Sequence, residues 1–147
     1  MKNKYGVSQK IYIAISWTLT VALMVTIFCL SSQVSSKSSG LSSGVISRIT
    51  ELFHITLTQH TVRKTAHALE YAALCFLFSC SWQSVFLKSF LSAALYASSD
   101  ELHQYFVSGR ACQPRDVLVD CLGASFGLLA FFIIYTVYTH IHKNKAR

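Results

Sequence analysis

The acidic residues of this chain are concentrated in one stretch that lies between two strongly apolar segments. Four of its six Asp and Glu residues fall within Ser98–Asp120, between FLSAALYA and an apolar run from Val117 to Tyr138. A fifth, Glu70, lies within another apolar run. Acids in such a context are energetically costly and mark functional sites in membrane proteins. The fold must therefore place these acids against protein groups or water rather than lipid.

The composition indicates a membrane protein and argues against nucleic-acid binding. Hydrophobic residues make up 52% of the 147 residues and charged residues 13%, about half of the charged share of a soluble domain. The mean hydropathy is +0.43, and the length suits one domain, residues 1–147. The net charge of +7 does not indicate nucleic acid, because the basic residues cluster at the chain ends and beside the acids.

Four segments are long enough to cross a bilayer as helices. We place these spans at about 11–30, 65–87, 89–107 and 117–138, with an outer loop at 31–64. The third span is polar in its second half and can cross only if that half faces protein or water. In Val45–Phe53, apolar and polar residues fall on opposite helical faces, which is typical of an interfacial helix. The predicted fold is all-α: four transmembrane helices in an up-down bundle, with a short amphipathic interfacial helix after the first span.

The distribution of lysine and arginine predicts the orientation of the chain. An even number of spans places both termini on one side of the membrane. Basic residues precede the first span and follow the last, which makes that side cytoplasmic by the positive-inside rule. We therefore predict a multi-pass protein of the cytoplasmic membrane with both termini cytoplasmic.

Charged and histidine side chains gather at one end of the second, third and fourth spans. Up-down connectivity brings these ends to the same membrane face, which the orientation above makes the outer one. His67/Glu70 and Asp100/His103 are both carboxylate–histidine pairs three residues apart, so each pair projects to one point of a helix face. The candidate catalytic residues in the resulting pocket are His67, Glu70, Asp100, Glu101, His103, Asp116 and Asp120.

Three interpretations of this pocket remain open. The acids can be structural partners of the nearby cations, because buried charges must be paired. Alternatively, Arg63, Lys64, Arg110 and Arg115 bind an anionic headgroup while the acids orient them. In the third, the pocket is catalytic, either with a divalent metal held by carboxylate–histidine pairs or with a histidine as general base and an arginine stabilising phosphoryl charge.

The fourth span carries a helix-packing signal on the same stripe as two of the acids. Gly123 and Gly127 form a GxxxG step, which lets a neighbouring helix approach closely. Asp116 and Asp120 precede these glycines at helical spacing. We therefore expect the two acids to face other helices.

Taken together, four motifs resemble those of the VanZ-like family of small bacterial membrane proteins, whose founding members are associated with resistance to the glycopeptide teicoplanin. The matching pieces occur in family order along nearly the whole chain: FCLSSQ (28–33), RKTAHALEY (63–71), DELHQYFVSGR (100–110) and RDVLVDCLGASFG (115–127). The resemblance adds further ligand-binding candidates to the cations already named. They are Ser31, Ser32, Gln33, Tyr71 and Gln104.

The resemblance also shapes the expected function. It implies a bacterial cell-envelope protein whose outer pocket binds or acts on a lipid-linked or cell-wall-related anionic ligand, lowering susceptibility to glycopeptides such as teicoplanin. The expected partner is a membrane lipid or a lipid-linked cell-wall precursor. The two alternatives are a membrane-embedded metal-dependent or phosphoryl-transfer hydrolase, and a non-catalytic accessory protein whose charged cluster is structural. The sequence leaves the oligomeric state open.

Overall fold

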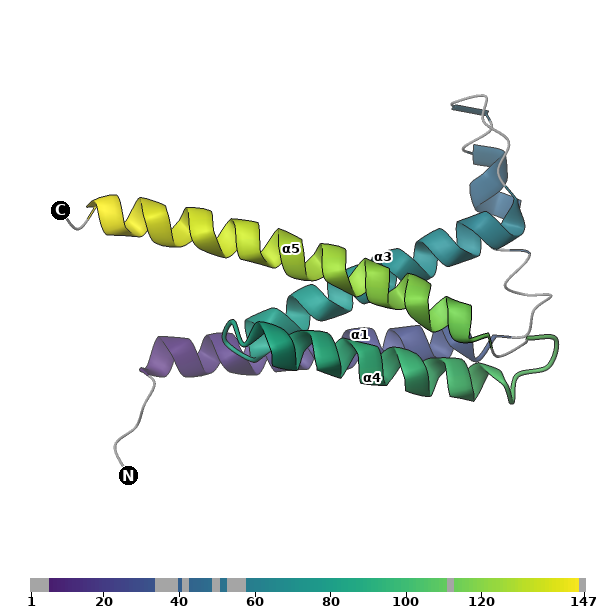
Figure 1. The fold of residues 1–147 in the computed structure, drawn as a ribbon, viewed down its shortest axis with the longest axis horizontal. Coiled ribbons are helices and arrows are strands. Elements are labelled where there is room, and N and C mark those ends of the chain that lie inside the picture. Colours follow the sequence, from purple (N-terminus) through teal and green to yellow (C-terminus); the bar gives the residue numbers. More distant parts are fainter. Residues whose placement is uncertain are drawn as a thin grey trace.

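Four long helices run up and down in a bundle. The structure is a computed structural model, and it describes residues 6–33, 40, 43–48, 51–52, 58–110 and 113–145. Its long helices are α1 (Val7–Ser31), α3 (Gln59–Ser81), α4 (Phe86–Gln104) and α5 (Pro114–Lys145). α1 and α4 run in one direction and α3 and α5 in the other, so α1 begins and α5 ends at the same end of the bundle (Figure 1). The described residues contain no strand, which confirms the all-α prediction.

Local sequence signals account for the starts of α3 and α5. The Thr58 hydroxyl accepts a hydrogen bond from the Thr61 amide at 3.1 Å and so caps the first turn of α3. Pro114 is the first residue of α5, a position where the amide hydrogen that proline lacks would have no partner within the helix. Asp116 lies in the same first turn, where its negative charge interacts favourably with the helix dipole.

The turn between α3 and α4 is built from two non-glycine residues in the left-handed region. Gln83 has a φ of 55° and Ser84 a φ of 68°, a conformation that is uncommon for residues with a side chain. The Gln83 side-chain amide donates to the Cys80 carbonyl at 2.9 Å, which helps to hold the turn. This reversal makes α3 and α4 consecutive antiparallel helices.

The helix boundaries differ from the predicted spans in several places. The predicted span 65–87 joins two elements, because α3 ends at Ser81 and α4 already begins at Phe86. The third span was predicted to end at residue 107, whereas α4 ends at Gln104. The predicted outer loop 31–64 contains helical residues 43–48, 51–52 and 59–64. Positions 49, 50 and 53 of the predicted interfacial helix lie outside the described residues, so its helical character is confirmed only in part.

Two helices have the length and hydropathy of membrane spans. These are α1 and residues 114–143 of α5, and they are mostly exposed within the bundle. α3 and α4 do not reach that composition, because each carries several polar or charged residues. The crossing of the membrane by all four helices therefore stays a prediction.

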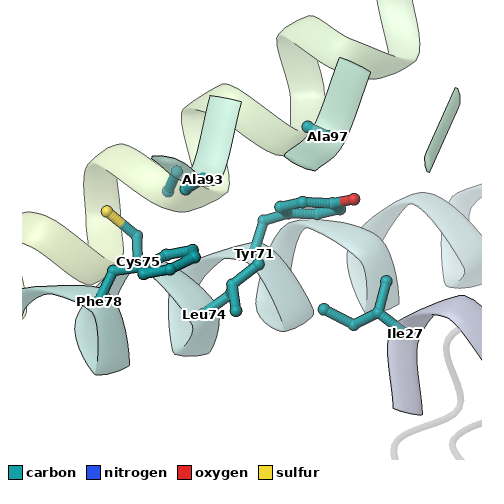
Figure 2. Packing of buried hydrophobic residues seen from close by; sticks show 8 residues of the cluster. Ile27, Tyr71, Leu74, Cys75, Phe78, Ala93 and Ala97 are labelled. Atoms are coloured by element: carbon teal, nitrogen blue, oxygen red, sulfur yellow. The ribbon is translucent and has the colours of Figure 1, made fainter. Parts of the chain in front are cut away.

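The apolar core lies where α1, α3, α4 and α5 meet. Figure 2 shows the Tyr71 ring of α3 between Ala97 of α4 and Ile27 of α1. Tyr71, Ile27 and Ala97 are at most 1% exposed. The small residues of α4 allow the large α3 side chains to fill the space between helices. This core lies directly beside the acids of α4, so it fixes the position of the polar cluster.

α5 packs against α3 through its two glycines, as the GxxxG step predicts. A Cβ atom on Gly123 would lie 2.1 Å from the Ala68 carbonyl oxygen, and one on Gly127 would lie 1.9 Å from the Ala72 carbonyl oxygen. Both distances are shorter than any real contact, so only glycine permits this approach. The close packing places Asp120 and Asp116, one and two turns before Gly123 on α5, beside the first half of α3.

Candidate functional site

The polar residues converge at one end of the bundle, where α1 and α4 end and α3 and α5 begin; we call this the polar end. At its centre lies Asp100 of α4, whose side chain is buried. Its Oδ2 accepts hydrogen bonds from Ser31 Oγ at 2.8 Å and from Gln104 Nε2 at 3.1 Å. Asp100 therefore joins α1 to α4 through two neutral donors and no cation.

Arg110 extends this network to the end of α1. Its Nη1 donates to Gln104 Oε1 at 3.0 Å, its Nε to the Gln33 carbonyl at 3.2 Å and its Nη2 to the Leu30 carbonyl at 3.4 Å. The last carbonyls of a helix lack partners within the helix, and the guanidinium supplies donors for them. Burial, together with the nearby Arg63, lowers the pKa of Arg110 below its usual value. Arg110 thus holds Ser31–Gln33 against α4.

A second connection ties α3 to α5. Lys64 Nζ forms an ion pair with Asp116 Oδ1, and both side chains are less than one-third exposed. Glu101 of α4 is 3% exposed, and its Oε1 accepts a hydrogen bond from the Gln113 backbone amide at 2.6 Å. The two contacts fix the start of α5 against α3 and α4.

Several buried polar atoms at this end have no hydrogen-bond partner among the described residues. They are Asp100 Oδ1, Tyr71 Oη and His67 Nδ1. His67 Nδ1 lies 3.6 Å from Glu70 Oε2, beyond hydrogen-bond distance. Figure 2 shows the Tyr71 hydroxyl pointing away from the Phe78 side of the core. Unsatisfied buried polar groups are costly, so these atoms mark positions where water or a ligand group can bind.

His103 and Ser32 form a separate contact between α4 and α1. Ser32 Oγ lies 3.0 Å from His103 Nε2, and the His103 ring stacks on Phe28 with ring centroids 4.4 Å apart. His103 faces α1, whereas His67 lies on α3. The convergence of the two carboxylate–histidine pairs stays a prediction.

Two cavities open at the polar end. The smaller, of about 20 Å³, has room for about one water molecule. It is lined by Lys64, His67, Glu101, Gln104, Asp116, Val119 and Asp120. Asp120 is 3% exposed and makes no hydrogen bond or ion pair with the described residues. This carboxylate thus meets the cavity without a protein partner.

The larger cavity has a volume of about 250 Å³ and lies nearer the surface. It is lined by His60, Arg63, Lys64, His67, Gln104, Gly109, Arg110, Gln113 and Asp116. Three cations thus line it against one carboxylate, Asp116, which is already paired with Lys64. The larger cavity is therefore suited to an anion.

Some of the predicted site residues line these two cavities and others do not. Neither cavity is lined by Ser31, Ser32, Gln33, Glu70, Tyr71, Asp100, His103 or Arg115. Ser31 and Ser32 join the end of α1 to α4 through Asp100 and His103, and Arg115 is exposed. Arg63, Lys64 and Arg110 line the larger cavity, and the single pocket expected from the sequence stays a prediction.

Sequence reasoning missed three residues of the larger cavity, namely His60, Gly109 and Gln113. His60 falls within the predicted outer loop 31–64, but it lies in the first turn of α3, three residues before Arg63 and seven before His67. The Thr58 cap was the signal that could have placed it on this face. Gln113 bonds Glu101 through its backbone amide, for which no side-chain signal exists.

The described residues do not form a metal centre. No three His, Cys, Asp or Glu side chains in this part of the chain are arranged to hold a metal ion. The carboxylates instead contact a hydroxyl, an amide or Lys64. The chemistry available here is anion binding by cations and proton transfer by an unpaired carboxylate or imidazole.

Comparison with known proteins gives one match. A family model described as VanZ/LLP1 matches residues 16–135, which include α3, α4, most of α1 and α5, and every residue of the polar end described above. No curated protein and no solved structure matches the chain.

Proposed function

The chain belongs to the VanZ/LLP1 family of membrane proteins, and from this premise we propose that its polar end binds the anionic head of a lipid-linked cell-wall precursor. In the cell this binding lowers susceptibility to glycopeptide antibiotics such as teicoplanin. The observation that carries the proposal is the cationic lining of the 250 Å³ cavity.

The cations of this cavity are held in place by the buried layer beneath them. Asp100 binds Gln104, and Gln104 binds Arg110, so a buried carboxylate fixes the guanidinium through one amide. Asp116 holds Lys64 in the same way from α5. Pre-positioned cations lose less side-chain entropy when an anion binds, which strengthens binding. The acids thus orient the cations instead of cancelling them.

The position of the cavity favours a ligand that is anchored in the membrane. It lies at the end of the bundle where the apolar helices α1 and α5 end and begin. A phosphate carried on a polyprenyl chain would sit at this level, with its chain along the apolar helix surfaces. Lys64 and the guanidinium of Arg63 or Arg110 provide donors for phosphate oxygens.

The test is binding of a polyprenyl phosphate to the purified protein in detergent, with the neutral polyprenol as comparison. We expect the phosphate to raise the melting temperature and the alcohol to have little effect. Arg63→Gln should weaken phosphate binding, whereas Arg48→Gln, which removes an exposed cation outside the cavity, should not. Equal effects of phosphate and alcohol would refute anion recognition.

The same variants can be tested in cells. At equal membrane levels, overexpressed protein is expected to raise the inhibitory concentration of teicoplanin, and Arg63→Gln to abolish the increase. Loss of folding is monitored by the melting temperature without ligand. A variant that folds normally, fails to bind the phosphate and still protects cells would show that binding in the cavity does not cause resistance.

One observation favours hydrolysis as a second candidate function. Asp120 makes no hydrogen bond or ion pair with the part of the chain that the structure describes, and it lines the water-sized cavity beside Lys64. A carboxylate in this position can act as general base for water that attacks a phosphoryl group, while Lys64 stabilises the charge that develops. Release of inorganic phosphate from a polyprenyl diphosphate, lost in Asp120→Asn, would establish this activity. Binding without release would restrict the site to recognition.

A further inference from the structure

The two cavities at the polar end are joined by a small set of shared residues. The side chains that line both cavities are Lys64, His67, Gln104 and Asp116. Three of these four are engaged with other side chains, because Lys64 pairs with Asp116 and Gln104 bonds both Asp100 and Arg110. The fourth, His67, has a buried Nδ1 atom without a hydrogen-bond partner in the part of the chain that the structure describes.

The position of His67 follows from the periodicity of α3. It lies four residues after Arg63, so both side chains are on the face of α3 that borders the larger cavity. Its side chain is 24% exposed, and Nδ1 lies 3.6 Å from Oε2 of Glu70, three residues further along the same helix. The imidazole is thus mostly enclosed, with Glu70 beside one nitrogen and both cavities beside the ring.

The surroundings of His67 indicate a neutral ring before an anion binds. Charged and titratable groups face it from three helices and from the loop after α4. They are His60, Arg63, Lys64, Glu70 and Tyr71 on α3, Asp100 and Glu101 on α4, Asp116 and Asp120 on α5, and Arg110 in the loop. An imidazolium has two N–H donors that need acceptors. None of these carboxylates accepts a hydrogen bond from His67 in the described ranges.

We propose that His67 takes up a proton when a phosphate binds in the larger cavity, so that the imidazolium becomes a further cation of the site. This inference rests on the proposed function, because the ligand is the same phosphate. The proton comes from water and completes the second N–H of the ring. One N–H then donates to a phosphate oxygen and the other to Glu70 Oε2, for which a shift of about 0.5 Å from the present 3.6 Å is enough.

The physical cause is the negative charge that the ligand brings. An anion next to the ring favours its charged form, and the charged ring in turn strengthens binding of the anion, since the two equilibria are linked. Histidine changes its charge between about pH 5 and pH 8. Binding should therefore strengthen as the pH falls through this range, by at most about tenfold per pH unit for one linked proton. At higher pH, binding depends on the arginines and Lys64 alone.

The test is calorimetric titration of polyprenyl phosphate into the purified protein in detergent. Measurements at one pH in two phosphate-free buffers of different ionisation enthalpy give the number of protons taken up on binding. His67→Gln keeps a polar side chain that cannot be protonated. We expect this variant to take up fewer protons, by up to about one, and to lose most of the pH dependence of the affinity. The phosphate's own proton contributes equally to both proteins, so the difference between them reports the histidine.

His60→Gln is the matched control. His60 also lines the larger cavity, but it is exposed and does not line the water-sized one. Its removal should leave the proton uptake unchanged. Glu70→Gln is a second test variant, because it removes the negative charge that stabilises the imidazolium and should lower the uptake. The melting temperature without ligand verifies the folding of each protein.

The outcomes separate this inference from the proposed function. Equal proton uptake by the wild type, His67→Gln and Glu70→Gln would overturn the inference while anion binding stands. Loss of uptake in His60→Gln alone would assign the proton to the outer histidine and would overturn it as well. Absence of phosphate binding at every pH would refute the proposed function and the inference together.

Discussion

Replacing Gly127 by alanine tests whether α3 and α5 are as close as the structure indicates. The added Cβ would lie 1.9 Å from the Ala72 carbonyl oxygen, and an ordinary contact begins at 3.4 Å. The helices must therefore separate locally by about 1.5 Å, the difference between these two distances. The obstacle is backbone, so no rotation of a side chain relieves it.

In Gly127→Ala the gain in helix propensity and the cost of the backbone clash change the free energy of unfolding in opposite directions. Alanine is a better helix former than glycine by about 1 kcal/mol, which alone would stabilise α5. Overpacking costs typically about 1–3 kcal/mol, and a backbone clash belongs at the upper end of that range. We therefore expect a net destabilisation of roughly 1–2 kcal/mol. Separation of the helices would also weaken the Lys64–Asp116 ion pair, which joins the same two helices.

The assay is thermal unfolding of the purified protein in detergent. Gly127→Ala should melt at a lower temperature than the wild type. The control is Ser125→Ala, two residues away on the exposed side of α5, where the gain in helix propensity meets no clash. Adding Ala72→Gly should not restore stability, because the contact is with the Ala72 carbonyl. A Gly127→Ala protein that melts at or above the wild-type temperature would refute the close approach.

Three further predictions concern the polar end and the orientation of the chain. Ser31→Ala removes one of the two donors to buried Asp100 and should lower the free energy of unfolding by about 1–3 kcal/mol; unchanged stability would mean that water replaces the hydroxyl. Arg110→Lys keeps the charge but cannot bond Gln104 and two α1 carbonyls together, so it should lower the melting temperature while Arg115→Lys, at an exposed position, should not. The orientation can be tested with single cysteines at Ser36 and Asn144, in a protein whose exposed native cysteines are replaced. In intact cells an impermeant thiol reagent should label the cysteine at Ser36 and not the one at Asn144. The opposite pattern would place the polar end in the cytoplasm.

The arrangement of the helices could be predicted because the polar residues occur at alternate ends of successive apolar segments. Asp100 and Asp116 lie 16 positions apart in the sequence, yet both belong to the polar end, as up-down connectivity requires. The GxxxG step also predicted a close helix contact. These features follow from helix periodicity and chain direction alone.

The turn between α3 and α4 could not be predicted in the same way. SWQS contains neither glycine nor proline, although Gln83 and Ser84 adopt the left-handed conformation that such residues normally supply. Without that signal, hydropathy extended the second span through the turn to residue 87. The contacts that hold the turn, such as the hydrogen bond from Gln83 to the Cys80 carbonyl, outweigh the preference of these two residues for a negative φ.

The partners of Arg110 were also beyond sequence reasoning. One of the three interpretations paired the arginines with acids, but Arg110 bonds an amide and the Leu30 and Gln33 carbonyls at the end of α1. Those carbonyls lie where α1 ends, and their positions depend on how α1 packs against α4. A sequence shows which side chains carry charge but not which backbone groups a tertiary contact leaves available.

α5, which is translated after α1, α3 and α4, completes the polar end. A nascent chain that stops after α4 has Glu101 without the Gln113 amide, Lys64 without Asp116, and the α3 carbonyls of Ala68 and Ala72 without the glycines that cover them. The acids of α4 are thus synthesised before the groups that enclose them. Assembly of this end must therefore follow translation of α5, and a stop codon between α4 and α5 removes the site even though most of its residues have already been made.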